Sequence, residues 1–110
     1  MSVRGFMDEF RAGTTRYSGP HIWNERVSII IAPHRTWVTL CRIQALDAGH
    51  GDGSAAMKWL CALADKHRVR MSGVAEPFGS RFLELPALIV WYNKFGFTVT
   101  NDYYIDREVA

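Results

Sequence analysis

Three glycines at alternate positions, Gly49, Gly51 and Gly53, separate an apolar extended segment from an amphipathic one. The segment before them, Trp37 to Leu46, is rich in β-branched and apolar residues and is predicted to be a strand. The segment after them repeats apolar residues at helical spacing, which predicts a helix from about Ser54 to His67. Glycine is favoured where φ is positive or where another group approaches the backbone closely. This combination of strand, turn and helix therefore constrains the fold more than any other feature of the chain.

The remaining elements follow from apolar periodicity and from the positions of Gly and Pro. Helices and strands alternate along most of the chain, which predicts an α/β (α+β) fold with a mixed, mostly antiparallel sheet flanked by helices. The predicted order begins with a helix through Phe6 and Phe10 that ends at Gly13, followed by two or three strands, most simply an antiparallel pair at 21–32 and 37–46. After the glycine turn come the helix already described, a strand before Pro77, a helix with Pro86 in its first turn and Gly96 just past its end, and a hairpin that turns at Asn101 and Asp102.

Composition narrows the class of protein. The chain has 110 residues, 48% hydrophobic and 22% charged, which fits one globular domain. The net charge is only +2 and no basic run occurs, so we expect no nucleic-acid partner. The apolar runs are too short to span a membrane, and Asp8 and Glu9 interrupt the N-terminal segment where a signal peptide would be apolar, so we expect a soluble, cytoplasmic protein without a membrane partner. Cys41 and Cys61 are expected to be buried, reduced thiols, and no Cys or His spacing predicts a metal site.

The glycine turn predicts an anion site. The first N–H groups of a helix have no intrahelical acceptor and lie at the positive end of its dipole, where phosphates bind. A plain turn with Asp52 as N-cap is the alternative without a ligand. The chain has no Walker A motif, but Gly51, Gly53 and Ala56 fit a dinucleotide fingerprint, with Glu76 where an acid would bind the ribose. The antiparallel pair before the glycines disfavours that fingerprint, because it normally follows the first strand of a parallel unit.

Two motifs in order resemble a known family. "IQALDAGHGDGSAAM" resembles the pyrophosphate-binding motif of the GCN5-related N-acetyltransferases, which reads Q or R, x, x, G, x, then G or A, with Gly51 and Gly53 as its last two positions. "WYNKFGF" resembles the second signature of the family, a Tyr followed by x, Lys, x, Gly and Phe. The resemblance extends over about Trp37 to Thr100, and the N-terminal region is shorter than is usual in the family. It implies a single acyltransferase domain over residues 1–110, similar in size to short members found in phages.

The resemblance also implies site residues and a cosubstrate, acetyl-CoA. The strand end would leave main-chain groups free for the pantetheine arm, and the glycine turn would hold the pyrophosphate; these residues are Ile43, Gln44 and Ala45, then Gly49, His50, Gly51, Asp52, Gly53 and Ser54. Tyr92 occupies the position of the general acid of the family, whose phenol protonates the departing thiolate. For the general base we choose Glu76, at the end of its strand, while Glu84, His50 and water remain alternatives.

The function that this implies is direct transfer of an acetyl group from acetyl-CoA to a primary amine. The acceptor is a protein lysine, a protein N-terminus or a small amine. Ala48 and Leu85 stand where the family usually has Arg or Gln and Asn, and Asp52 adds a carboxylate beside the pyrophosphate. These three positions keep a second hypothesis open, a coenzyme-binding or protein-interaction module without catalysis. A small nucleotide-binding module is a third hypothesis, and a homodimer through the tryptophan-rich surface is also open.

Overall fold

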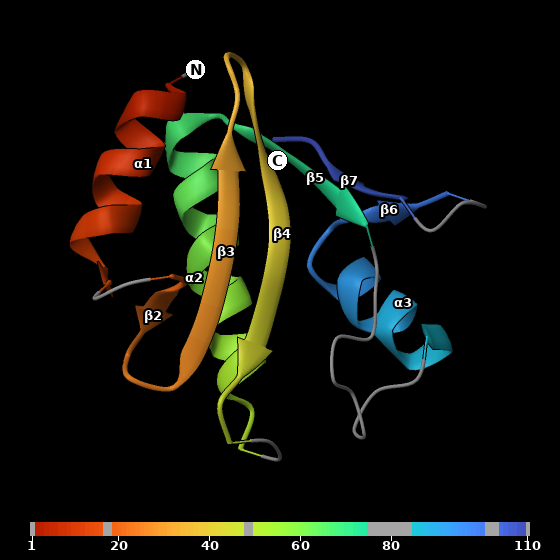
Figure 1. Cartoon of the computed structure of the whole chain (residues 1–110). Helices are drawn as coiled ribbons and strands as arrows, with labels where there is room; N and C mark the ends of the chain where they lie inside the picture. Colours follow the sequence, from red (N-terminus) through yellow and green to blue (C-terminus); the bar gives the residue numbers. More distant parts are fainter. Residues whose placement is uncertain (1, 17–18, 48–49, 75–84, 101–103, 110) are drawn as a thin grey trace.

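A computed structural model describes residues 2–16, 19–47, 50–74, 85–100 and 104–109 (Figure 1). Within these residues seven strands form one sheet in the order β1-β2-β3-β4-β5-β7-β6, in which only the β4–β5 pair is parallel. The predicted mixed, mostly antiparallel α/β fold is therefore confirmed. The elements are α1 (Val3–Ala12), β1 (Thr14–Thr15), β2 (His21–Trp23), β3 (Val27–Pro33), β4 (Trp37–Ala45), α2 (Asp52–His67), β5 (Arg70–Val74), α3 (Leu85–Lys94), β6 (Thr98–Val99) and β7 (Tyr104–Arg107).

Capping residues set the helix ends much as the sequence predicts. The Ser2 hydroxyl accepts a hydrogen bond from the Gly5 amide at 2.8 Å and so begins α1, which ends at Gly13. Helix α3 has a proline in its first turn, and Gly96 follows its end with φ of 90°, a conformation that favours glycine. Helix α2 begins at Asp52, two residues earlier than predicted.

The segment from His21 to Ala32 contains two strands, β2 and β3, so the three-strand alternative of the prediction is the one that the structure has. Asn24 and Glu25 have φ of 51° and 59°, and the amide of Arg26 donates to the carbonyl of Trp23 at 3.0 Å. These residues turn the chain into a β2–β3 hairpin. Glutamate rarely adopts a positive φ, so the turn within this apolar run was not evident from the sequence. The predicted hairpin of β6 with β7 is confirmed, while its turn at 101–102 lies outside the described residues.

The protein is two layers thick, with extents of 34 × 32 × 20 Å. Helices α1 and α2 lie side by side against the sheet, and α3 lies below β5 and β7 in the view of Figure 1. Side chains of one sheet face form the core together with the helices; its fully buried members from the strands include Val27, Ile29, Val38, Met71 and Ile105. On the opposite face Ile30, Trp37, Val74 and Tyr104 are exposed. None of the described helices has the length and apolar character needed to cross a membrane.

Candidate functional site

Strands β4 and β5 separate partway along β4. They pair in parallel from Trp37 opposite Arg70 to Leu40 opposite Gly73, and β4 then continues over residues 41–45 beside β3 only, among the described residues. A β-bulge lies at the same point, because Ile31 pairs with Leu40 and Ile30 with Arg42, so that Cys41 has no partner in the register. Main-chain groups of successive residues alternate between the two edges of a strand. Since the amide of Leu46 donates to the carbonyl of Arg26 on the β3 side, Gln44 also faces β3, and the groups of Ile43 and Ala45 face the edge that β5 has left. The side chain of Gln44 has a partner of its own, because its amide oxygen accepts a hydrogen bond from Arg42.

The structure corrects the prediction for one cysteine. Cys41 is exposed, because it alternates with the buried Val38 and Leu40 and so lies on the outer face of β4 with Trp37. Cys61, on the core face of α2, is buried as predicted, and desolvation raises the pKa of its thiol to about 11.

The two backbones approach most closely at Gly73, just before the strands separate. A Cβ at this position would overlap the carbonyl oxygen of Leu40, which the sheet holds in place. We expect Gly73→Ala to lower the free energy of unfolding by about 1–3 kcal/mol, as overpacking does. Urea denaturation followed by circular dichroism measures this change. Gly53→Ala is the control, because a Cβ there comes no closer than 4.0 Å to its neighbours; equal losses in both variants would contradict the expectation.

The first turn of α2 presents its amides without a side-chain cap. Gly51 is the N-cap residue with φ of 72°, and the first intrahelical bond runs from the amide of Ala55 to the carbonyl of Gly51 at 3.1 Å. The N–H groups of Asp52, Gly53 and Ser54 therefore precede the hydrogen-bonded ladder of the helix. The alternative in which Asp52 caps the helix is wrong, because Asp52 is the first helical residue and no side-chain cap bond is present.

Asp52 is instead paired with an arginine that the sequence did not single out. Its Oδ2 lies 3.5 Å from Nη1 of Arg26, and the two side chains are 15% and 57% exposed. The main chain fixes this arginine at the start of β3, where its carbonyl accepts from the Leu46 amide at 2.8 Å. Arg26 thus places a mobile positive charge beside the first turn of α2 and offsets the charge of Asp52. Arg26 belongs to the β2–β3 turn at residues 24–26, far from the glycine turn in the chain, so local sequence patterns did not indicate its pairing with Asp52.

The other predicted residues of the glycine turn divide into described and undescribed ones. His50 has an acidic neighbour, with its Nε2 3.2 Å from Oδ2 of Asp47. Glu76, the predicted base, lies outside the described residues. So do Gly49, Ala48 and Glu84, and these predictions stay open.

Helix α3 contacts the first turn of α2 through a tryptophan. The indole Nε1 of Trp91 donates to the Ser54 hydroxyl at 2.8 Å, and a Cβ on Gly53 would lie 4.0 Å from the indole ring. This bond occupies a lone pair of the Ser54 oxygen and leaves its hydrogen free to donate elsewhere. Trp91 stands one residue before Tyr92 in the second motif, and this position was the available signal in the sequence.

Tyr92 is the next residue of α3 and is held by aromatic contacts. Its ring packs edge-on against Trp91 at 5.2 Å and Phe97 at 5.4 Å between centroids, and only 5% of the residue is exposed. Burial raises the pKa of its phenol to about 12. The hydroxyl is therefore protonated at neutral pH and able to donate a proton or hydrogen bond. Trp91 binds Ser54 in the first turn of α2 and also contacts Tyr92, so Tyr92 lies near the same end of α2 as the uncapped amides.

Comparison with known proteins supports the fold. No protein-family model matches the chain, and no curated protein matches it significantly. Among solved structures, the chain is similar to that of the anti-CRISPR protein AcrVA5, with a TM-score of 0.64 and 17% sequence identity. The match covers 77% of this chain and 93% of that chain. At this identity the likeness establishes a shared fold.

Proposed function

We propose that this protein is an N-acetyltransferase that uses acetyl-CoA and transfers the acetyl group to a primary amine. The observation that carries the proposal is the separation of β4 from β5 beyond Leu40, next to an uncapped first turn of α2 and a buried tyrosine. Free strand amides suit the amide-containing pantetheine arm, and helix N-terminal amides suit a diphosphate. The resemblance of the two motifs to the GCN5-related N-acetyltransferases supports the same conclusion.

The residues present fit the coenzyme. The amides of Asp52, Gly53 and Ser54 point out of the first turn, the Ser54 hydroxyl keeps a hydrogen to donate, and Arg26 adds a guanidinium. Asp52 opposes an anion here, but its carboxylate is already paired with Arg26. Two charges at about 4 Å in a solvent-screened site interact by on the order of 1 kcal/mol, so the pairing decides whether this end of α2 attracts an anion.

The reaction needs little chemistry from the protein beyond orientation and proton transfer. The amine nitrogen attacks the thioester carbonyl carbon, a C–N bond forms, and the C–S bond breaks. One proton leaves the amine for a base, and one is delivered to the sulfur of the departing thiolate. Tyr92 is the proposed donor of that second proton, because its buried phenol is kept protonated. Glu76 remains our choice for the base.

The role of Arg26 has a direct test. We expect Arg26→Ala to weaken acetyl-CoA binding by about tenfold, because one charge-assisted contact is lost and Asp52 becomes an unpaired carboxylate. Isothermal titration calorimetry measures the dissociation constant. Asp52→Asn is the matched variant and should tighten binding several-fold, since it removes the opposing charge. Unchanged affinity in both variants would place the diphosphate elsewhere.

A binding module without catalysis is the second candidate function, and the Asp52 carboxylate in the first turn of α2 is the observation that favours it. Calorimetry with acetyl-CoA and an assay of thiol release with primary amines distinguish the two. Binding without thiol release, across small amines and lysine-containing peptides, would support the module. Tight binding of NAD with none of acetyl-CoA would support the nucleotide-binding alternative.

A further inference from the structure

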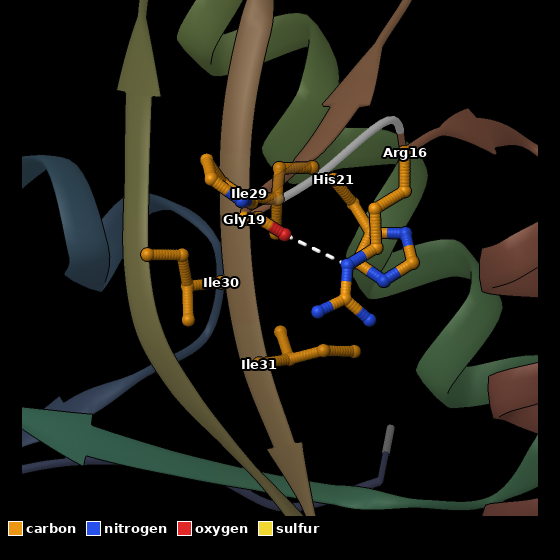
Figure 2. Close-up of a pocket in the computed structure, with 7 residues that line it drawn as sticks. Arg16, Gly19, His21, Ile29, Ile30 and Ile31 are labelled. Atoms are coloured by element: carbon orange, nitrogen blue, oxygen red, sulfur yellow. Dashed lines mark hydrogen bonds between the residues drawn. The ribbon is translucent and has the colours of Figure 1, made fainter.

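A pocket lies on the far side of β3 from β4, away from the strand separation (Figure 2). Its volume is about 310 Å³, and it is lined by Arg16, Gly19, Pro20, His21 and the β3 residues Ile29, Ile30 and Ile31. Apolar side chains and one cationic side chain therefore share the pocket. The proposed acetyl transfer uses none of these residues.

Strand β3 has a free edge at this pocket. Its pairing with β2 ends where Ile29 lies opposite His21, yet β3 continues to Pro33. Over residues 30–33 the described part of the chain pairs β3 with β4 alone. Figure 1 shows β3 extending well past the short β2. Such an edge presents unpaired N–H and C=O groups to which an extended peptide can add as a strand.

Arg16 supplies a fixed positive charge at the start of that edge. Its Nε donates to the carbonyl of Gly19 at 2.8 Å, and Figure 2 shows the two terminal nitrogens turned away from Gly19, on the side of Ile31. Within the described ranges no carboxylate lies within salt-bridge distance of this guanidinium. Its terminal donors have the fork geometry that binds a carboxylate with two hydrogen bonds.

The wall beside the arginine is held in place by contacts of His21. The Thr14 hydroxyl donates to the carbonyl of Phe10 at 2.8 Å and so accepts from Nδ1 of His21, 2.9 Å away. The His21 ring also packs on Phe10 with centroids 4.8 Å apart. A ligand at this pocket therefore meets a preformed surface and orders few side chains on binding.

We infer that this pocket and the free edge of β3 bind an extended peptide segment that carries an acidic side chain. The segment adds as a strand beside residues 30–33, and its carboxylate pairs with Arg16. Charge complementarity selects this occupant over a second copy of the chain: β3 reads VSIIIAP, without an acid, so a two-fold β3–β3 contact would bring two Arg16 side chains together with no carboxylate between them. A free small carboxylate would leave the strand edge unused.

The first experiment uses fluorescein-labelled heptapeptides of alternating Thr and Val with a central Glu, and fluorescence anisotropy. We expect the Glu peptide to bind and its Gln counterpart to bind about tenfold more weakly, as loss of a charge-assisted contact requires. Peptides N-methylated at alternate residues test strand addition, because the N–H groups of a strand alternate between its two edges. Methylation on one edge should abolish binding, and methylation on the other should leave it unchanged. Equal affinity of the Glu and Gln peptides, or equal effects of the two methylation patterns, would overturn the inference.

Protein variants and hydrogen exchange complete the test. Arg16→Gln should remove the preference for Glu, while Arg11→Gln, whose native side chain lies 3.9 Å from Asp8 on the exposed face of α1, should keep it. Bound Glu peptide should slow exchange of those amides of residues 30–32 that face the free edge. Protection of these amides that rises with protein concentration in the absence of peptide would identify the edge as an interface between two copies and overturn the peptide proposal. Because thiol release and coenzyme affinity report on the other site, failure here leaves the proposed transferase function separately testable.

Discussion

Tyr92→Phe is expected to lower the rate of acetyl transfer about a hundredfold or more, because general acid catalysis contributes roughly 10²–10⁴-fold. The substitution removes only the hydroxyl. The ring keeps its edge-on contacts with Trp91 and Phe97, so the fold and the affinity for acetyl-CoA should remain close to those of the wild-type protein. Thiol release measures the rate, and calorimetry measures the affinity.

The pH dependence provides a second readout of the same residue. An exposed tyrosine ionises near pH 10, but burial raises the pKa of Tyr92 to about 12. The catalytic form is the protonated one, and it is lost only as the pH rises through this raised pKa. We therefore expect activity to persist between about pH 9 and pH 11, where a solvated phenol would already titrate.

Tyr104→Phe is the matched control, because Tyr104 is 58% exposed on the opposite face of the sheet. It should retain the wild-type rate. A Tyr92→Phe protein with full activity would show that the sulfur takes its proton from water, and a protein that lost coenzyme binding as well would give the tyrosine a structural role.

Local signals in the sequence predicted the elements on which the site is built. Glycine at 51 and 96 marks the start of α2 and the end of α3, and both adopt positive φ in the structure. Apolar periodicity placed β4 and α2 on either side of the glycine turn to within two residues. These features depend on each residue's own backbone preference and on its near neighbours, so they can be derived without knowledge of the fold.

Contacts between distant segments were not predictable in this way. Arg26 reaches Asp52 only because a turn at Asn24 and Glu25 folds β2 back along β3. The Trp91–Ser54 hydrogen bond joins two residues that are 37 positions apart in the chain. The end of β4–β5 pairing coincides with the bulge at Cys41, and a bulge shifts the register by one residue without a distinctive residue type. Each of these features is set by packing, which overrides local preference.

Two arginines of the sheet each form an ion pair with an aspartate, and the two pairs differ mainly in burial. This difference leads to the second large prediction. Arg107 on β7 binds both carboxylate oxygens of Asp65 on α2 at 2.8 Å, and its Nε donates to the carbonyl of Phe95 at 2.8 Å; its side chain is 8% exposed. Arg70 on β5 binds both oxygens of Asp106 at 2.6 and 2.7 Å, but its side chain is 55% exposed.

We expect Arg107→Met to lower the free energy of unfolding by about 1–3 kcal/mol, because the Phe95 carbonyl and the Asp65 carboxylate, which is 33% exposed, both lose this partner. Arg70→Met should cost less than about 1 kcal/mol, as exposed pairs do. Urea denaturation of the two variants measures the difference. Adding Asp65→Leu to Arg107→Met should recover part of the loss, because the carboxylate that has lost Arg107 is then removed.

The larger loss should also affect the proposed site, because Phe95 directly follows α3 and lies three residues after Tyr92. Loosening this end should weaken the Trp91–Ser54 contact, so the indole fluorescence of Arg107→Met should shift to longer wavelength before global unfolding. Arg70→Met changes an exposed side chain on the opposite face of the sheet and should show no such shift. If both variants lose the same stability and neither shifts the fluorescence, the buried pair does not anchor α3 against α2, and the position of Tyr92 must depend on the aromatic contacts alone.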